Sequence, residues 1–245
     1  MSLRITLLTA GRVLRQLRHD RRTLAMMVVV PAVLLTLLHF MYEQRPQVFD
    51  HVALLMLGIF PFIMMFLVTS IAKLRERTTG TLERLFTTPA GKADLLFGYG
   101  LAFGLAAAVQ ATVATLFSAW VLGLDPAGDL GLVVLIAVTN ALLGVSLGLM
   151  FSAFARTEFQ AVQFMPVVAM PQILLCGLFV PREDMAGWLQ AVSDVLPLTY
   201  AVTALQEVGA HADPTGTMWH GLLVVAAVVV LALVLGAATL RRRTA

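Results

Sequence analysis

The stretch that decides the fold is Leu-Gly-Leu-Val-Val-Leu-Ile-Ala-Val-Thr-Asn-Ala-Leu-Leu-Gly-Val-Ser-Leu-Gly-Leu-Met-Phe-Ser-Ala-Phe, residues 130–154, which contains no charged side chain. A helix needs about 20 mainly apolar residues to cross the hydrocarbon layer of a membrane. Five other stretches have the same character: residues 23–42, 52–72, 95–122, 160–180 and 220–240. We therefore predict an all-α integral membrane protein in which residues 1–245 form a single domain of six transmembrane helices.

The composition agrees with this class. Hydrophobic residues make up 59% of the chain and charged residues 13%, which leaves too little polar surface for a soluble globule. The net charge of +3 does not indicate nucleic acid, because the basic residues flank the apolar stretches. Anionic lipid headgroups are the expected partner of cations in that position.

The distribution of basic residues predicts the orientation in the membrane. Of the 17 Lys and Arg residues, all but Arg45 and Arg182 fall on one side of the six predicted spans. Positive charge is retained on the cytoplasmic side. We expect a multi-pass protein of the plasma (inner) membrane with both termini in the cytoplasm.

Residues 1–22 are predicted to form an amphipathic helix that lies in the membrane interface. Apolar residues recur there at helical spacing, with arginines on a neighbouring stripe. The apolar set is Leu3, Leu7, Ala10, Leu14 and Leu17. The alternative is a basic flank that only sets the topology.

Small residues in the third and fourth spans predict close helix packing. Gly144 and Gly148 also enclose Ser146 in a Gly-x-Ser-x-Gly pattern, the motif of a hydrolase nucleophile. That chemistry needs a strand-to-helix turn and a positioned histidine, so we interpret the two glycines as packing residues. The five histidines show no metal-ligand spacing, and we predict no catalytic, cofactor or metal residue in this chain.

No Asp, Glu, Lys or Arg lies within the six predicted spans. Ion-coupled carriers usually place such groups in the membrane, so this class is disfavoured. The chain also lacks a phosphate-binding loop, because the Gly91-Lys92 pair has neither the earlier glycine nor the following Ser or Thr. If ATP powers this protein, the ATPase is a separate chain and this one is not an enzyme on its own.

Residues 73–94 form the longest polar connection predicted on the cytoplasmic side. After Gly80, Thr81 can cap a short helix that Pro89 ends. A short charged helix suits docking to a soluble partner, and a hairpin loop with solvated charges is the alternative.

This loop resembles that of type-2 ABC exporter membrane subunits, where Glu-Arg, then Gly-Thr-Leu-Glu, then Thr-Pro recur. A second match is Gly-Leu-Phe-Val-Pro at residues 177–181, Trp-Leu-Gln at 188–190 and Leu-Pro-Leu-Thr-Tyr-Ala at 196–201. The chain looks most similar to the daunorubicin-resistance type of drug permease. The resemblance makes the loop the site that couples to the ATPase, carried by Glu76, Arg77, Thr78, Gly80, Thr81, Leu82, Glu83, Arg84 and Leu85.

The same resemblance implies two membrane subunits, identical or different, clasped by two cytoplasmic ABC ATPase subunits that bind the ATP and Mg. It also implies a gate in the outer segment, residues 181–219. Met, Val, Leu and Trp recur there at helical spacing, which predicts short re-entrant helices or, alternatively, a helix lying flat on the outer surface. The residues assigned to this gate are Val180, Pro181, Trp188, Leu196, Pro197 and Tyr200.

Spans two and five carry Phe, Met and Gln side chains that suit an apolar passenger, although ordinary lipid-facing residues are the alternative. The candidate pathway residues are Phe60, Phe62, Phe66, Gln163, Phe164 and Gln172. The predicted function is export of a hydrophobic or amphipathic substrate (a drug, a lipid or a lipid-linked glycan) from the cytoplasm or inner leaflet. A membrane assembly or interaction protein that transports nothing is the competing hypothesis.

Overall fold

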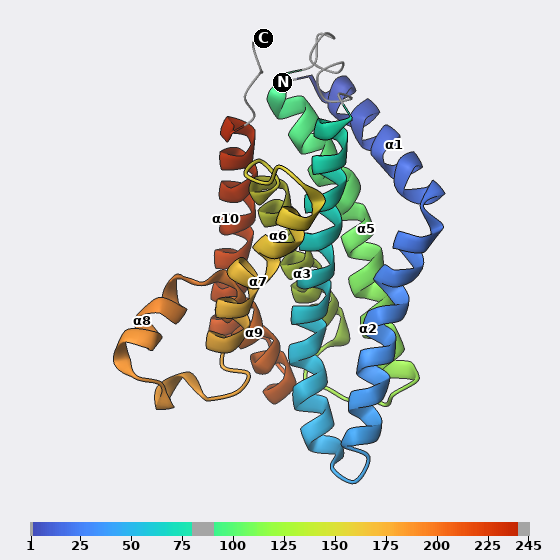
Figure 1. The fold of residues 1–245 in the computed structure, drawn as a ribbon. Coiled ribbons are helices and arrows are strands. Elements are labelled where there is room, and N and C mark those ends of the chain that lie inside the picture. Colours follow the sequence, from blue (N-terminus) through green and yellow to red (C-terminus); the bar gives the residue numbers. More distant parts are fainter. Residues whose placement is uncertain (1, 80–90, 240–245) are drawn as a thin grey trace.

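The computed structural model describes residues 2–79 and 91–239, and every regular element in these two ranges is a helix (Figure 1). The predicted all-α class is therefore confirmed for the described residues. The helices are α1 (Leu3–His19), α2 (Arg21–Met41), α3 (Pro46–Thr78), α5 (Lys92–Trp120), α6 (Leu130–Phe151), α7 (Glu158–Leu175), a 3-10 turn η1 (Arg182–Asp184), α8 (Gly187–Val195), α9 (Pro197–Ala210) and α10 (Gly216–Thr239).

Five helices in the described part are long and apolar enough to cross a membrane. They are α2, α3, α5 from Ala93, α6, and α10 up to Ala238. The predicted fifth span corresponds to α7, whose 18 residues include three glutamines and two prolines and which does not reach this standard. The six-span layout thus remains a prediction, whereas the multi-pass character is clear.

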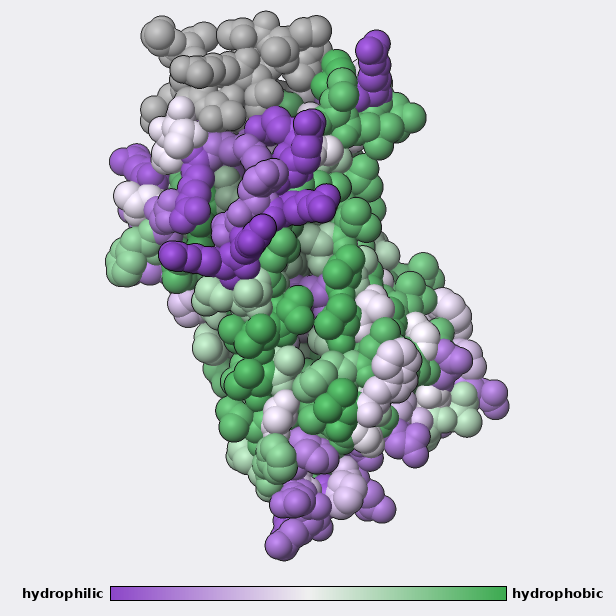
Figure 2. Space-filling view, turned by 90° about the vertical axis from the view of Figure 1, so that its right-hand side faces the viewer, coloured by the Kyte–Doolittle hydropathy of each residue, from purple (hydrophilic) through white to green (hydrophobic). Residues whose placement is uncertain are grey.

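Polar and apolar surface separate along the bundle. Figure 2 shows a broad apolar belt with polar side chains gathered above and below it. The start of α1, the end of α3 and the end of α10 lie at the same end of the molecule (Figure 1). An even number of crossings would produce this arrangement.

The centre of the bundle is the contact between α3 and α6. A Cβ atom added at Gly144 would overlap the carbonyl oxygen of Phe62, and one added at Gly148 would overlap the carbonyl oxygen of Phe66. Ser146, between these glycines, is buried and donates to the carbonyl oxygen of Leu143 at 2.9 Å. The Gly-x-Ser-x-Gly pattern therefore allows two helix backbones to approach closely, as glycine does in membrane helix pairs.

Three helix boundaries differ from the predicted span boundaries. Helix α3 begins at Pro46 and continues to Thr78, so the first six residues of the predicted 73–94 loop are helical. Lys73 is consequently a buried charged residue inside this long helix, which the predicted 52–72 span did not include. Helix α7 ends at Leu175 rather than at residue 180, because Gly177 with φ +93° turns the chain away.

Within the predicted 1–22 helix, the described residues contain α1 and the first two residues of α2, separated by Asp20. Helix α1 ends at His19, and Asp20 caps α2 by accepting from the backbone N–H of Thr23 at 3.1 Å. Ala10 and Val13 pack against α5, while Leu3 and Leu7 of the predicted apolar stripe are exposed. One side of α1 is thus held by the bundle, and exposed leucines are available to lipid on another side.

Candidate functional site

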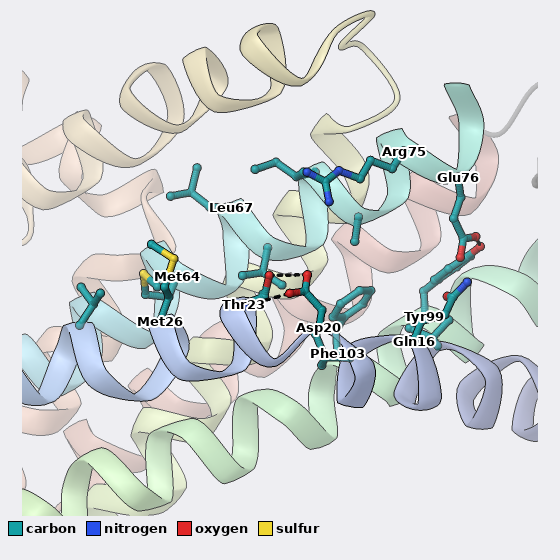
Figure 3. Close-up of a pocket in the computed structure, with 16 residues that line it drawn as sticks. Gln16, Asp20, Thr23, Met26, Met64, Leu67, Arg75, Glu76, Tyr99 and Phe103 are labelled. Carbon is teal, nitrogen blue, oxygen red and sulfur yellow. Dashed lines mark hydrogen bonds between the residues drawn. The ribbon is translucent and has the colours of Figure 1, made fainter. Parts of the chain in front are cut away.

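A partly buried ion pair joins the end of α3 to α1 and α5. Arg12 on α1 makes a two-point contact with Glu76, with Nη1 3.0 Å from Oε1 and Nη2 3.1 Å from Oε2. The hydroxyl of Tyr99 on α5 donates to the same carboxylate, and Arg12 Nη2 donates to that hydroxyl at 3.0 Å. Figure 3 shows Glu76 and Tyr99 directed toward each other. Two-point Arg–carboxylate contacts fix the relative orientation of the elements that carry them.

Two basic side chains of α3, Lys73 and Arg77, donate to carbonyl groups in the last turn of α6 and just after it. Lys73 Nζ donates to the carbonyl oxygen of Leu149 at 2.8 Å, and Arg77 Nη1 donates to that of Ala153, also at 2.8 Å. Arg77 also donates to the carbonyl oxygen of Ala155. The last carbonyl groups of a helix lack partners within it and carry partial negative charge, so cations stabilise them. These contacts attach the end of α3 to α6.

An exposed ion pair links α3 to α7. Arg75 Nε lies 2.7 Å from Glu158 Oε1, and Nη2 lies 3.1 Å from Oε2. Hydrogen bonding from this guanidinium holds the pKa of Glu158 below its ordinary value. Because both side chains are about half exposed, solvent screening keeps the energy of the pair small.

The start of α5 is anchored by a buried carboxylate. Asp94 accepts from the backbone N–H of Ser2 at 2.7 Å and from that of Gly91 at 3.1 Å. Gly91 is the residue that precedes α5. The described residues on both sides of positions 80–90 are therefore fixed to the bundle by buried charged groups.

The structure describes only some of the predicted coupling residues. Glu76 and Arg77 lie in the last turns of α3 and contact the bundle, whereas Thr78 is exposed. Residues 80–85, which hold the remaining six, lie outside the described residues. Sequence analysis missed Arg12 and Tyr99, because 64 and 23 residues separate them from Glu76 and no motif joins them.

At the opposite end, hydrogen bonds join α7, α8 and α9. Ser193 is fully buried and its hydroxyl donates to the carbonyl oxygen of Leu175 at 2.8 Å. The side-chain oxygens of Ser193 and Thr199 are 3.2 Å apart. Gln172 accepts from the backbone N–H of Leu198 at 3.4 Å. The beginning of α9 is thereby attached to the end of α7.

The predicted gate residues are distributed over this outer segment. Trp188 on α8 is 70% exposed and Val180 is also exposed. Pro197 begins α9, and the Tyr200 hydroxyl donates to the carbonyl oxygen of Asp194 at 2.7 Å. Helix α9 packs against α3, α7 and α10. The short helices exist as predicted, whereas their insertion into a leaflet remains a prediction.

The predicted pathway residues do not share one surface in this chain. Phe62 and Phe66 are fully buried in the core. Gln163 is exposed and lies with Phe164 in a shallow surface depression on α7. Gln172 is buried, and its amide also donates to the carbonyl oxygen of Val168 at 3.0 Å. The interhelical hydrogen-bonding alternative for Gln172 therefore has direct structural support.

Among residues 2–79 and 91–239, no group of three or more His, Cys, Asp or Glu side chains could hold a metal ion. The fold is that of a multi-pass, helical membrane domain. The polar contacts of Glu76, Arg77 and Asp94 lie on the two sides of residues 80–90.

Comparison with known proteins identifies the family. Residues 4–208 match the model of the ABC-2 type transporter family, and the chain belongs to this family. It is 30% identical over 141 residues to ABC transporter G family member 20 of Dictyostelium discoideum, covering 58% of this chain and 19% of that protein. The alignment to the probable multidrug ABC transporter permease YbhR of Escherichia coli is 30% identical over 156 residues, covering 64% and 42%.

A third relative is the linearmycin resistance permease protein LnrN of Bacillus subtilis, at 26% identity over 138 residues, which covers 56% of this chain and 36% of that protein. The matched part of this chain spans less than half the length of these curated relatives. The expected class, the membrane permease part of an ABC transporter, is thus confirmed.

Proposed function

We propose that this chain is the membrane-spanning subunit of an ATP-driven exporter that moves hydrophobic or amphipathic compounds out of the cytoplasm or inner leaflet. Membership of the ABC-2 type transporter family supports this proposal. Two relatives carry names that refer to multidrug transport and linearmycin resistance. We infer the substrate class from those names and from the Phe- and Met-rich helices of this chain.

The observation that carries the coupling mechanism is the anchoring on both sides of residues 80–90. Glu76 binds Arg12 on α1, Arg77 binds the end of α6, and Asp94 binds the chain before α5. A displacement of the connection would therefore move α1, α3, α5 and α6 together instead of bending one loop. We propose that a cytoplasmic ABC ATPase, which holds the ATP and Mg, docks on this connection.

The proposed complex contains a second membrane subunit, identical or different, and two ATPase subunits. In this proposal the end that carries α1 lies on the cytoplasmic side of the inner membrane. The arginines of α1 favour this orientation. Movement of α3 and α7 then opens the outer end around residues 180–200. The hydrogen bonds of Ser193 and Gln172 make α9 follow α7 during that movement.

Glu83→Lys tests the coupling proposal. The variant should insert into the membrane at the normal level yet lose substrate export and the stimulation of ATP hydrolysis by substrate, because reversed charge disrupts register at a docking surface. Glu183→Lys, an exposed charge reversal in the outer segment, is the matched control and should retain export. The measurement is efflux of a fluorescent amphipathic dye from cells that co-express the copurifying ATPase. Normal export by Glu83→Lys would remove this residue from the mechanism.

A second experiment addresses the energy source. The purified chain in vesicles without an ATPase should accumulate no dye, and addition of the ATPase with ATP and Mg should start accumulation. Uphill transport by this chain alone would contradict the proposed function.

A further inference from the structure

A cavity of about 560 Å³ lies between the second half of α3 and the segment formed by the end of α1 and the first half of α2 (Figure 3). Residues of α1, α2, α3 and α5 line it. This volume falls within the usual range of small-molecule sites, about 300–1,000 Å³. The cavity is unrelated to the predicted pathway residues, none of which contributes to its wall.

The wall of the cavity changes in polarity along its length. Met26, Met64 and Leu67 lie together at one end in Figure 3, and Phe103 lies beside Asp20. Asp20 and Thr23 supply polar atoms where α1 turns into α2. A polar group close to a long apolar surface matches a molecule that has a polar head and an apolar tail.

One carboxylate in this wall lies outside the salt bridges that bind the other charged lining residues. Three lining residues carry charge: Asp20, Arg75 and Glu76. Arg75 is bound to Glu158, and Glu76 is bound to Arg12 and Tyr99. Asp20 makes no salt bridge in the described part of the chain. It accepts from the Thr23 backbone at 3.1 Å and from the Thr23 hydroxyl at 2.6 Å, and the charge of Arg75 also acts on it.

The state of Asp20 makes it a suitable anion. The two hydrogen bonds from Thr23 lower the pKa of its carboxyl group below the ordinary value, with a smaller contribution from the charge of Arg75. The side chain is therefore ionised at neutral pH. A carboxylate has lone pairs for further donors, so the contacts with Thr23 leave it able to accept from a ligand.

We propose that this cavity binds an amphiphile with an ammonium head and an alkyl tail. The ammonium group pairs with Asp20, and the tail lies against Met26, Met64 and Leu67. Aromatic Phe103 adds a favourable surface for the cation. This inference goes beyond the proposed function, because the site can hold a resident lipid or a foreign compound whether or not the chain transports it.

Native mass spectrometry of the full chain, released from non-ionic detergent micelles, tests the proposal. The probes are dodecylamine, dodecanol and dodecyl sulfate, which share one tail and differ in head charge. Dodecylamine should bind about tenfold more tightly than dodecanol, the ratio expected from one charge-assisted hydrogen bond. Asp20→Asn should remove this preference while keeping the helix cap, since asparagine also caps helices well.

Asp129→Asn is the matched control. Asp129 caps α6 by accepting from the backbone N–H of Gly131, and it does not line the cavity. This variant loses the same charge and should keep the preference for dodecylamine. Met64→Trp, which fills the apolar end, should weaken binding of all three probes, with circular dichroism confirming that each variant is folded.

Phosphatidylethanolamine and phosphatidylglycerol then distinguish the source of the ligand. An Asp20-dependent preference for phosphatidylethanolamine identifies a membrane lipid, and a preference limited to dodecylamine identifies a smaller amphiphile. Equal binding of dodecylamine and dodecanol, or a preference that survives in Asp20→Asn, would overturn the proposal. These results do not depend on export, so a failure here leaves the transport proposal standing, and the reverse also holds.

Discussion

Helix α3 has two sides that are packed in opposite ways. Toward α6, Gly144 and Gly148 bring the two backbones together with no space for a side chain. Toward the first half of α2, a cavity of about 560 Å³ remains. In the most apolar 18-residue stretch of α2, 17% of the residues are buried inside the chain, compared with 61% in those of α3 and α6.

The α3–α6 pair is therefore closely packed, whereas the α3–α2 pair is loosely packed. Within a membrane, helices associate by close packing and hydrogen bonds rather than by exclusion of water. Helices α3 and α6 therefore form one unit, whereas α2 contributes only Met27, Pro31 and Leu35 as buried residues.

The largest expected effect follows from changing the tight side. Gly144→Ala should destabilise the folded chain by about 3 kcal/mol, the upper part of the usual range for overpacking, because the new methyl group meets the backbone of Phe62. The measurement is the apparent Tm and the yield of monodisperse protein in detergent.

Gly100→Ala is the matched control for that variant. A Cβ atom at Gly100 would lie 3.5 Å from Leu233 Cδ2, an ordinary contact, and alanine favours the helix by about 0.5–1 kcal/mol. Its Tm should equal or exceed that of the wild type. Equal Tm values for the two variants would show that α3 and α6 can separate at little cost, which would remove the contrast between the two sides.

An intermediate effect on stability is expected at the C-terminal end of α3. Glu76→Gln leaves the Arg12 guanidinium partly buried without its anion and should cost about 2 kcal/mol, in the range for hydrogen bonds to charged groups. Glu158→Gln removes a similar contact from an exposed pair and should cost less than about 1 kcal/mol. Thermal unfolding of both variants in one detergent compares them.

The same two variants address coupling. Glu76→Gln should reduce dye export in the complex with the ATPase more strongly than Glu158→Gln, since Glu76 joins α3 to α1 and α5. Indistinguishable Tm and export values would mean that the partly buried pair does not transmit the movement.

The smallest effect concerns pH. The folded pKa of Glu158 lies below its ordinary value of 4.5, so its pair with Arg75 contributes fully above about pH 4.5 and is lost as the pH falls through the lower folded pKa. The Tm difference between wild type and Glu158→Gln should be constant from pH 7 to 5 and shrink below pH 4.5. A difference that grows on acidification would have the wrong sign and would contradict this assignment.

The sequence by itself determined the helical class, the membrane environment and the family. Apolar stretches near 20 residues require a membrane, and a helix satisfies its own backbone hydrogen bonds there, so class follows from local composition. The small residues Gly144 and Gly148 also indicated close packing before any partner helix was known. The loop motifs around Gly80 predicted the family that the comparisons identify.

Only the tertiary structure decided which charged groups meet and where space remains. Arg12 and Glu76 are 64 residues apart, and Lys73 reaches a carbonyl group 76 residues away, so no local periodicity encodes either contact. The cavity beside Asp20 is likewise lined by residues of four helices that are distant in the sequence. Contacts of this kind depend on how helices pack in three dimensions, whereas hydropathy reports only the tendency of each helix to enter the membrane.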